Sequence, residues 1–435
     1  MSKINLGKKF DVVVIGGGPA GMMAAGTAGR NGSSVLLLEK NNTLGKKLLL
    51  TGNGRCNLTH AEFDNKEFIK SLGKKGKFLF SSLNVFGPEE VMEFFANLGV
   101  PIKIEAGGKV FPASNKADDV LRALEKYLKN NKVEVMMRAD VLGFEIEEKN
   151  GQKEITGVHL KRGVIYADKF ILTTGGASYP LTGSTGSGYA WARACGHTIV
   201  TPIPTLVPLK TEENWVKEAQ GVSLKDARIS LVQNNKKTFS QQGDLIFTHF
   251  GLSGPTILNL SRKMTELENQ KENIFISIDL KPAMDKKALD IFLQKDFIKH
   301  ANKNVINYLA ETVPAKLAKA LLRLANIPAE KKNNVITREE RGKIVNLLKD
   351  LRLTVVGDTG FDQAMVTRGG VELKEVDPKT MQSKIVPNLY LAGEVLDLDG
   401  PTGGYNLQIC WSTGHAAGTY CTKNKNEKKN KCQKY

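Results

Sequence analysis

The sequence has little cysteine, and none of it is paired at short spacing. The five cysteines, at positions 56, 195, 410, 421 and 432 of 435, form no CxxC motif. This scatter argues against a disulfide framework, a zinc site and a dithiol relay. We therefore expect a reducing compartment and no metal.

Long hydrophobic runs are also missing. No apolar stretch approaches the roughly 18 residues of a membrane-spanning helix. The N-terminal "KINLGKKF" leaves no room for a signal peptide before the first expected strand. We expect a cytoplasmic protein with no membrane partner.

Acidic residues are outnumbered, which gives a formal net charge of +17. The tail "TKNKNEKKNKCQKY" (422–435) holds six lysines against one glutamate, and we expect it to be disordered. Basic charge is compatible with nucleic-acid binding. No RNP motif, helix-turn-helix or zinc finger accompanies it, so a solvated surface is the favoured interpretation. We do not expect nucleic acid as a partner, and the oligomeric state stays open.

The chain begins with a β-α-β pattern. Residues 10–15 form an uninterrupted apolar run, residues 18–31 an Ala/Gly-rich helix, and "SSVLLLE" (33–39) a second buried strand. Composition changes at the proline-rich "TPIPTLVPLK" (201–210). From about 353, apolar strand-like runs and glycine-rich turns like those of the N-terminal region appear again. The simplest account is one α/β domain interrupted by an inserted module.

The glycines after the first strand predict a dinucleotide site. Gly16 permits a tight turn, Gly18 lets a pyrophosphate approach the backbone, and Gly21 allows close helix packing. Pro19 and Ala20 open the helix, whose N-terminus attracts phosphate. Glu39 ends the second strand, where a carboxylate can accept both ribose hydroxyls and repel a 2′-phosphate.

Two later elements favour FAD over NAD. "FILTTGG" (170–176) is a buried strand ending on Thr-Gly-Gly. "LYLAGEVLDLDGPTGGYNLQ" (389–408) places Gly393-Glu394 at a strand end and begins a helix near Asn406. An extended FAD needs both ends of such a fold, one for adenosine and one for the isoalloxazine ring.

The chain resembles the BaiN-like NAD(P)/FAD-dependent oxidoreductases, also labelled aminoacetone-oxidase-like flavoproteins. The matching stretches include "DVVVIGGGPAGMMAA", "GKKLLLTGNGRCNLTH", "ILTTGGASYPLTGSTGSGYAWARACGH", "GDLIFTHFGLSGPTIL" and "GEVLDLDGPTGGYNLQICWSTGHAAG". The resemblance covers nearly the whole chain except its tail. One departure from the wider flavoprotein pattern is Gly393-Glu394, where Gly-Asp is usual.

The resemblance implies a Rossmann-like FAD-binding domain of the glutathione-reductase-like class. An inserted β-barrel module and a small helical subdomain would complete the fold. The expected boundaries are 1–205 with 353–421 for the discontinuous FAD domain, 206–280 for the barrel, 281–352 for the helical part, and 422–435 for the tail.

Candidate cofactor ligands share small size, exposed backbone or charge near these motifs. They are Gly16, Gly18, Pro19, Ala20, Gly21, Glu39, Lys40, Lys47, Gly54, Arg55, Cys56, Asn57, Val141, Thr174, Gly175, Gly176, Gly393, Glu394, Gly404, Tyr405, Asn406 and Leu407. Val141 would contact adenine through its backbone if the family pattern holds.

His249 and Arg55 are the candidate catalytic residues. His249, in "FTHFGLSGP", titrates near neutrality and lies in the insert expected to cover the flavin. The planar fork of Arg55 fits a phosphate or a substrate carboxylate. Cys56 beside it is expected to be an inert small residue that contacts FAD. A hydrogen-bonded structural histidine and a loop-anchoring arginine are the alternatives.

These features predict an FAD-dependent oxidoreductase that transfers hydride to or from a small molecule, with NAD(P)H as an optional transient reductant. No second complete nucleotide motif is present to bind that reductant. Three alternatives stay open: a small-molecule amine oxidase, a flavin-containing RNA-modifying or RNA-binding protein, and a flavoprotein without turnover.

Overall fold

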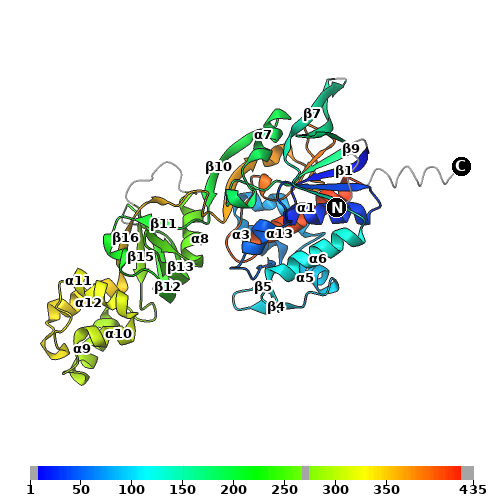
Figure 1. The fold of residues 1–435 in the computed structure, drawn as a ribbon. Helices are drawn as coiled ribbons and strands as arrows, with labels where there is room; N and C mark the ends of the chain where they lie inside the picture. The colour runs from blue at the N-terminus through cyan, green and yellow to red at the C-terminus, as the bar shows by residue number, and fades with distance from the viewer. Residues whose placement is uncertain (1–7, 150, 235, 267–273, 423–435) are drawn as a thin grey trace. The chain divides into compact units, whose positions relative to one another are not determined.

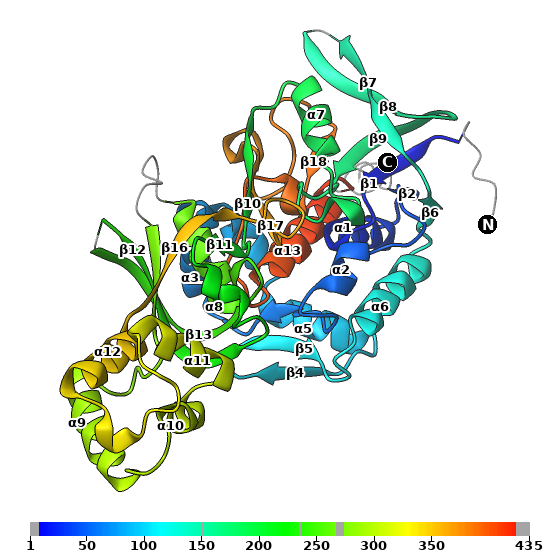
Figure 2. The same ribbon diagram turned by 60° about the vertical axis from the view of Figure 1, so that its left-hand side comes forward.

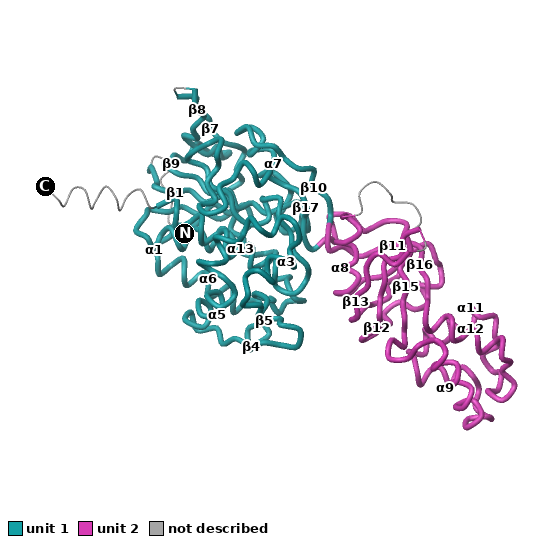
Figure 3. Tube along the Cα trace, turned by 180° about the vertical axis from the view of Figure 1, so that it is seen from behind, with its two compact units in different colours: residues 1–204, 365–435 teal, residues 205–364 magenta. Residues whose placement is uncertain are grey.

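The computed structural model describes residues 8–149, 151–234, 236–266 and 274–422 (Figure 1). The chain forms two compact units, residues 1–204 with 365–435 and residues 205–364 (Figure 3). The boundaries expected near 205 and 353 stay predictions. The expected disordered tail falls, from residue 423 onward, outside the described residues.

A mostly parallel sheet forms the centre of the first unit. Its described strands run in the order β6-β2-β1-β9-β8-β7, and β18 also pairs with β9. Their bounds are β1 (Phe10–Ile15), β2 (Val35–Glu39), β6 (Glu134–Met137), β7 (Val141–Lys149), β8 (Gln152–Leu160), β9 (Gly163–Leu172) and β18 (Leu389–Leu391). In the middle, Val13 pairs with Leu36 on one side and Phe170 on the other. The continuous apolar runs predicted as buried strands are confirmed.

Helices and two small sheets complete this unit (Figure 2). The helices are α1 (Pro19–Arg30), α2 (Lys46–Leu50), α3 (Asn65–Leu72), α4 (Phe80–Leu83), α5 (Pro88–Asn97), α6 (Ala117–Asn130), α7 (Ser187–Ala194) and α13 (Tyr405–Tyr420), with the 3₁₀ helix η1 (Lys74–Leu79). The small sheets are β3 (Thr59–His60), β5 (Lys109–Pro112) and β4 (Ile102–Glu105), and β10 (Ile199–Thr205) with β17 (Val366–Val371).

Helices α1 and α13 pack with almost no space between their backbones. A Cβ on Gly414 would lie 2.5 Å from the carbonyl oxygen of Ala20, and one on Gly418 would lie 2.4 Å from that of Ala24. Only glycine permits this approach. Gly414 and Gly418 of α13 therefore let this helix lie directly on the first turns of α1.

The second unit contains a closed barrel in the order β11-β14-β13-β12-β15-β16. Its strands are β11 (Leu209–Thr211), β12 (Ser223–Gln233), β13 (Lys236–Phe247), β14 (Gly251–Ser253), β15 (Ile274–Asp279) and β16 (Leu351–Asp358). Strand β16 closes the barrel, because Leu353 pairs with Ile276 and Val355 with Thr211. The expected α/β fold with a barrel insert is confirmed.

The helices of this unit are α8 (Pro255–Met264), α9 (Lys286–Lys299), α10 (Val305–Thr312), α11 (Ala315–Ala325) and α12 (Arg338–Lys349). Local capping explains where two of them begin. The carboxylate of Asp285 accepts from the amide of Ala288 at 2.7 Å, and Thr337 and Glu340 form a capping box at the start of α12. Helices α9–α12 correspond to the small helical subdomain of the expected fold, and its bounds of 281–352 stay a prediction.

Gly418→Ala should destabilise the first unit by about 1–3 kcal/mol, because the new methyl group would push α13 away from α1. Thermal unfolding followed by circular dichroism would show this as a lower melting temperature. Gly342→Ala is the matched control. An added Cβ there meets no atom within 4 Å in α12, so stability should rise slightly. Equal effects of the two variants would contradict the packing argument.

Candidate functional site

The glycine loop after β1 is closed by contacts that exclude side chains. Gly16 has φ of +108°, and a Cβ there would lie 2.5 Å from the carbonyl oxygen of Thr173. A Cβ on Gly21 would lie 1.8 Å from the carbonyl oxygen of Gly16. At Gly18, by contrast, an added Cβ meets nothing within 4 Å. The loop thus presents open backbone at the N-terminus of α1, which begins with Pro19 and has no side-chain cap.

Glu39 is buried and holds this loop. Its Oε2 accepts from the amide of Gly17 at 2.8 Å, and its Oε1 accepts from the amide and side chain of Asn41 at 2.8 and 2.7 Å. A carboxylate has about four acceptor positions, so roughly one remains for a ligand. The neighbouring Lys40 donates to Thr185 at 3.1 Å.

The end of β9 lies against the glycine loop and is equally crowded. Gly175 has φ of +74°, and a Cβ on Gly176 would lie 2.4 Å from Oγ1 of Thr367. The hydroxyl of Thr174 is buried and has no hydrogen-bond partner among the described residues. It faces Gly188, whose added Cβ would come within 2.0 Å.

The carboxylate of Glu394 is part of an ion pair. Lys47 contacts its two oxygens at 3.2 and 2.9 Å, and the amide of Thr367 donates to Oε1 at 2.8 Å. The amide of the preceding Gly393 donates to Oγ1 of Thr413 at 2.9 Å. The side chain that replaces the usual aspartate is therefore anchored by α2 and β17.

A glycine-rich turn precedes α13 and is held by Asn406. The side-chain oxygen of Asn406 accepts from the amide of Gly400, and its nitrogen donates to the carbonyl groups of Gly400 and Pro401, at 2.9–3.2 Å. Gly404 has φ of +105°, and a Cβ there would lie 2.3 Å from the carbonyl oxygen of Thr59. The turn is thus rigid where the helix begins.

The first residues of α13 are fixed by stacking. The rings of Tyr405 and His60 stack with centroids 4.6 Å apart, and Nδ1 of His60 lies 3.2 Å from the carbonyl oxygen of Gly403. Burial lowers the pKa of His60, which keeps the imidazole neutral near pH 7. Leu407 is buried in the same turn of helix.

Arg55 is bound to protein groups in the loop 51–57. Its Nη2 pairs with Glu105, its Nε and Nη2 donate to Asn115 at 2.9 and 2.7 Å, and its guanidinium lies 3.9 Å from the ring centroid of Phe111. Gly54 beside it has φ of +81° and an open Cβ position. The contacts fit the loop-anchoring alternative, and a contact with cofactor or substrate stays a prediction.

Cys56 is fully buried, and its backbone has φ of +59°. Burial raises the pKa of its thiol to about 12. The side-chain oxygen of its neighbour Asn57 accepts from the amide of Val110 at 3.2 Å, which joins the loop to β5. These contacts give Cys56 a packing role and no reactive thiolate.

The two remaining candidates lie further away in the chain. Val141 is buried at the start of β7, where it pairs with Leu160. His249 is exposed on the turn between β13 and β14 and packs edge-on against Phe250. It belongs to the second unit, so its catalytic role stays a prediction.

The candidates of the glycine loop, the end of β9 and the Glu394 segment meet within the first unit. The hydroxyl of Thr173 donates to the carbonyl oxygen of Gly16 at 3.0 Å, which joins β9 to the glycine loop. An added Cβ on Gly393 would lie 2.7 Å from that of Ala20. The glycine loop, the end of β9 and the Glu394 segment therefore form one surface of small residues.

Several residues of this site were not predicted. Asp397 and Asp399 are only 3% exposed at their side chains and pair with Lys75 at 2.5 Å and Arg368 at 2.9 Å. Thr367 contacts the end of β9 through its hydroxyl, which accepts from the amide of Ala177 at 2.8 Å. The signal for the acids was present, because aspartates in an apolar segment need buried partners. Their partners could not be read from local spacing.

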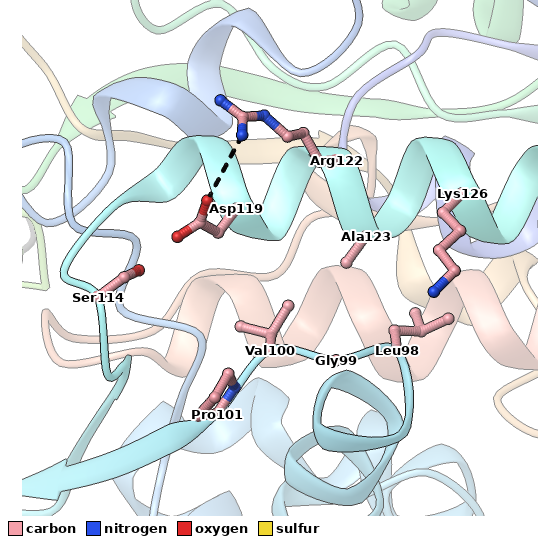
Figure 4. Close-up of a pocket in the computed structure, with 9 residues that line it drawn as sticks. All are labelled: Leu98, Gly99, Val100, Pro101, Ser114, Asp119, Arg122, Ala123 and Lys126. Carbon is pink, nitrogen blue, oxygen red and sulfur yellow. Dashed lines mark ion pairs between the residues drawn. The ribbon is translucent and has the colours of Figure 1, made fainter.

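A pocket lies elsewhere in this unit (Figure 4). Its volume is about 290 Å³, and it is lined by Leu98, Gly99, Val100, Pro101, Ser114, Asp119, Arg122, Ala123 and Lys126. No candidate cofactor residue is among them. In the described part of the chain, no group of three or more metal-ligating side chains is placed to hold an ion, and no helix is long and apolar enough to cross a bilayer.

Comparison with known proteins identifies relatives that cover more than nine-tenths of the chain. The family model described as "HI0933-like protein Rossmann domain" matches residues 10–420. A 3-dehydro-bile acid delta(4,6)-reductase of Clostridium scindens is 34% identical over 411 residues, which cover 93% of this chain and 97% of the relative. A ribosomal RNA dihydrouridine synthase of Escherichia coli is 30% identical over 409 residues, 94% and 97% of the two chains.

Solved structures show the same fold at low identity. A 3-ketosteroid-delta4-(5alpha)-dehydrogenase from Rhodococcus jostii is 16% identical with a TM-score of 0.53, covering 97% of this chain and 98% of that one. A 3-ketosteroid delta1-dehydrogenase from Sterolibacterium denitrificans is 13% identical with a TM-score of 0.54, covering 96% and 100%. The fold class predicted from the sequence is confirmed by these likenesses.

Native Cys56 should resist alkylation at pH 7.5, because a pKa of about 12 leaves almost no thiolate. N-ethylmaleimide labelling followed by peptide mass spectrometry should detect modification only after denaturation. A Ser114→Cys variant, altered at an exposed loop position, supplies the accessible thiol as a control. Labelling of Cys56 as fast as that control would contradict its inert role.

Proposed function

Because this chain belongs to the HI0933-like family of FAD-dependent oxidoreductases, we propose that it reduces a carbon–carbon double bond conjugated with a carbonyl group. FAD would be held by the first unit. Once bound, FAD supplies the hydride-transfer chemistry, and the protein supplies binding, orientation and proton transfer.

The glycine loop is the observation that carries this proposal. Gly18 leaves open backbone at the start of α1, where helix N–H groups attract phosphate oxygens. The remaining acceptor position of Glu39 is available to one ribose hydroxyl, with its other positions used by Gly17 and Asn41. The residues present therefore fit the adenosine and pyrophosphate parts of FAD. Lys40 and the backbone of Val141 are our candidates for the adenosine end.

The other end of FAD would meet the C-terminal segment. Lys47 and Glu394 offer charged groups for the ribityl chain, and Thr174 offers a buried hydroxyl that lacks a protein partner. A bound ligand is one explanation for such an unsatisfied hydroxyl. Backbone N–H groups of residues 404–407 at the start of α13 would face the flavin and stabilise negative charge on it.

The reaction class is supported by what two relatives have in common. One is named as a reductase of a 3-dehydro-bile acid and the other as a dihydrouridine synthase. Each name describes saturation of a double bond, and both double bonds are conjugated with a carbonyl group. Such a reduction adds a hydride to the β-carbon and a proton to the α-carbon. The chain must therefore hold the carbonyl and deliver a proton.

Two residues are our candidates for those tasks. We assign proton delivery to His249, whose exposed imidazole can carry a proton to a substrate. Arg55 uses Nε and Nη2 for Asn115 and Glu105, which leaves Nη1 to contact a phosphate or a substrate oxygen. We assign the donor role to NAD(P)H, which would dock only transiently.

Anaerobic spectroscopy tests this function. The purified protein should be yellow, and NADH or NADPH should bleach its flavin band. A 3-keto-4,6-diene steroid or a uridine-containing RNA should then restore the flavin band, because reduction of that substrate reoxidises the flavin. A well-folded preparation that stays colourless after incubation with excess FAD would rule out the proposal.

Glu39→Ala should lower FAD retention at least tenfold. A hydrogen bond to a charged group contributes roughly 1.5–3 kcal/mol, and the variant also releases the Gly17 amide. Equilibrium dialysis against FAD would measure the loss. Glu134→Ala, on the neighbouring strand β6 and paired with the exposed Lys8, is the control and should retain FAD. Unchanged retention in Glu39→Ala would remove Glu39 from the site.

A further inference from the structure

The 3₁₀ helix η1 presents one charged and aromatic row to solvent. A 3₁₀ helix has three residues per turn, so side chains three apart lie on one face. Gly76 and Leu79 form the buried face of η1, while Lys74, Lys77 and the following Phe80 are exposed. Successive members of this exposed series, which we call the η1 row, are about 6 Å apart at 2.0 Å per residue.

The η1 row is held rigidly. A Cβ on Gly76 would lie 2.3 Å from the carbonyl oxygen of Ile69, so η1 packs directly on α3. Lys75 points away from the row and pairs with Asp397 at 2.5 Å. Asp397 is buried and also accepts from the amide of Gly369 at 3.1 Å. A ligand on the row would therefore meet a preformed surface.

The same segment packs on the turn that begins α13, and α3 is seen near α13 in Figure 1 and Figure 2. The rings of Phe68 and Tyr405 have centroids 4.8 Å apart. An added Cβ on Gly400 would lie 2.7 Å from a methyl group of Leu72. Helix α3, on which η1 packs, thus also contacts the turn that begins α13.

Lysine is the charged residue type of the segment that carries the row, while the neighbouring carboxylates Glu67 and Asp397 pair with Lys70 and Lys75. The stretch "FIKSLGKKGKFLFSSLNVFGP" (68–88) contains four lysines and no acidic residue. Within the described part of the chain, Lys75 is the member of this stretch that pairs with a carboxylate across the fold, and Lys74 and Lys77 make no ion pair. Unpaired lysines beside an exposed aromatic ring match a phosphate backbone with unstacked bases.

We propose that the η1 row docks single-stranded RNA, with Lys74 and Lys77 on phosphates and Phe80 stacked on a base. This deepens the proposed function, on which it rests, by naming a uridine in RNA as the group that is reduced. The name of the Escherichia coli relative gives the same substrate class. A steroid would use neither the lysines nor their spacing.

The test uses the full-length, FAD-loaded protein and a short fluorescein-labelled, uridine-rich RNA strand. The double variant Lys74→Glu/Lys77→Glu should weaken binding about tenfold or more in fluorescence anisotropy. The plot of its log affinity against log salt should become shallower, with a slope about 1.4 less negative, because each phosphate contact in a single strand contributes about −0.7. The control Lys126→Glu/Lys129→Glu changes the same charge at the same spacing on exposed positions of α6 and should leave both quantities nearly unchanged.

A second pair of variants tests stacking. Phe80→Ala should weaken binding about tenfold, whereas Phe292→Ala, at a similarly exposed ring on α9 (43% against 46%), should not. Polyglutamate of equal charge should displace the RNA poorly. Equal losses in site and control variants, no binding by the parent protein, or effective displacement by polyglutamate would each overturn the proposal.

Flavin content separates this proposal from the proposed function. All variants should keep the FAD absorbance and the bleaching by NAD(P)H, because none of the altered residues lies in the glycine loop or at Glu394. A protein that binds FAD and reduces a steroid enone but shows no dependence on the η1 row would overturn RNA docking alone. A protein without FAD would overturn both.

Discussion

The contact between Gly21 and the carbonyl oxygen of Gly16 is the constraint on which the rest of the first unit depends. It brings the start of α1 so close to the end of β1 that no side chain fits between them. The N-terminus of α1 is thereby aimed at the open backbone of Gly18. Helix α13, which we propose to face the flavin, packs on α1 through Gly414 and Gly418. Close backbone contacts thus join β1, α1 and α13.

Buried charge provides the second level of order. The segment after β18 carries Glu394, Asp397 and Asp399, and each is paired with a cation from another part of the first unit. Breaking a buried pair leaves a charge without compensation, which is strongly destabilising. Each pair therefore ties this segment to a different element: Lys47 to α2, Lys75 to η1 and Arg368 to β17. Their common effect is to hold the turn before α13 in one conformation.

Sequence analysis recovered what depends on local pattern. The strands at 10–15 and 33–39, the helix between them, and the glycines around Gly16 follow from periodicity and from backbone conformations that other residues disfavour. Long-range contacts were not recoverable. Lys47 and Glu394 are 347 residues apart, and β16 joins the barrel only after four intervening helices. The three hydrogen bonds that Glu39 accepts from Gly17 and Asn41 were also not predicted. The sequence indicated a carboxylate facing ribose but did not show that these protein donors lie within its reach.

Relatives with differently named substrates share this fold. A separation between the residues that form the fold and the residues that would contact a substrate accounts for this. The glycine contacts around α1 would, in the proposed function, serve groups that every FAD molecule carries, so they would place no demand on the molecule that is reduced. In the flanking segment, Gly76 and Leu79 form the buried face that seats η1, and Lys74 and Lys77 are exposed. Function is carried by sites grafted on a fold. In the function we propose, the fold would supply the flavin site, and selection among conjugated carbonyl substrates would fall to the surface beside α13.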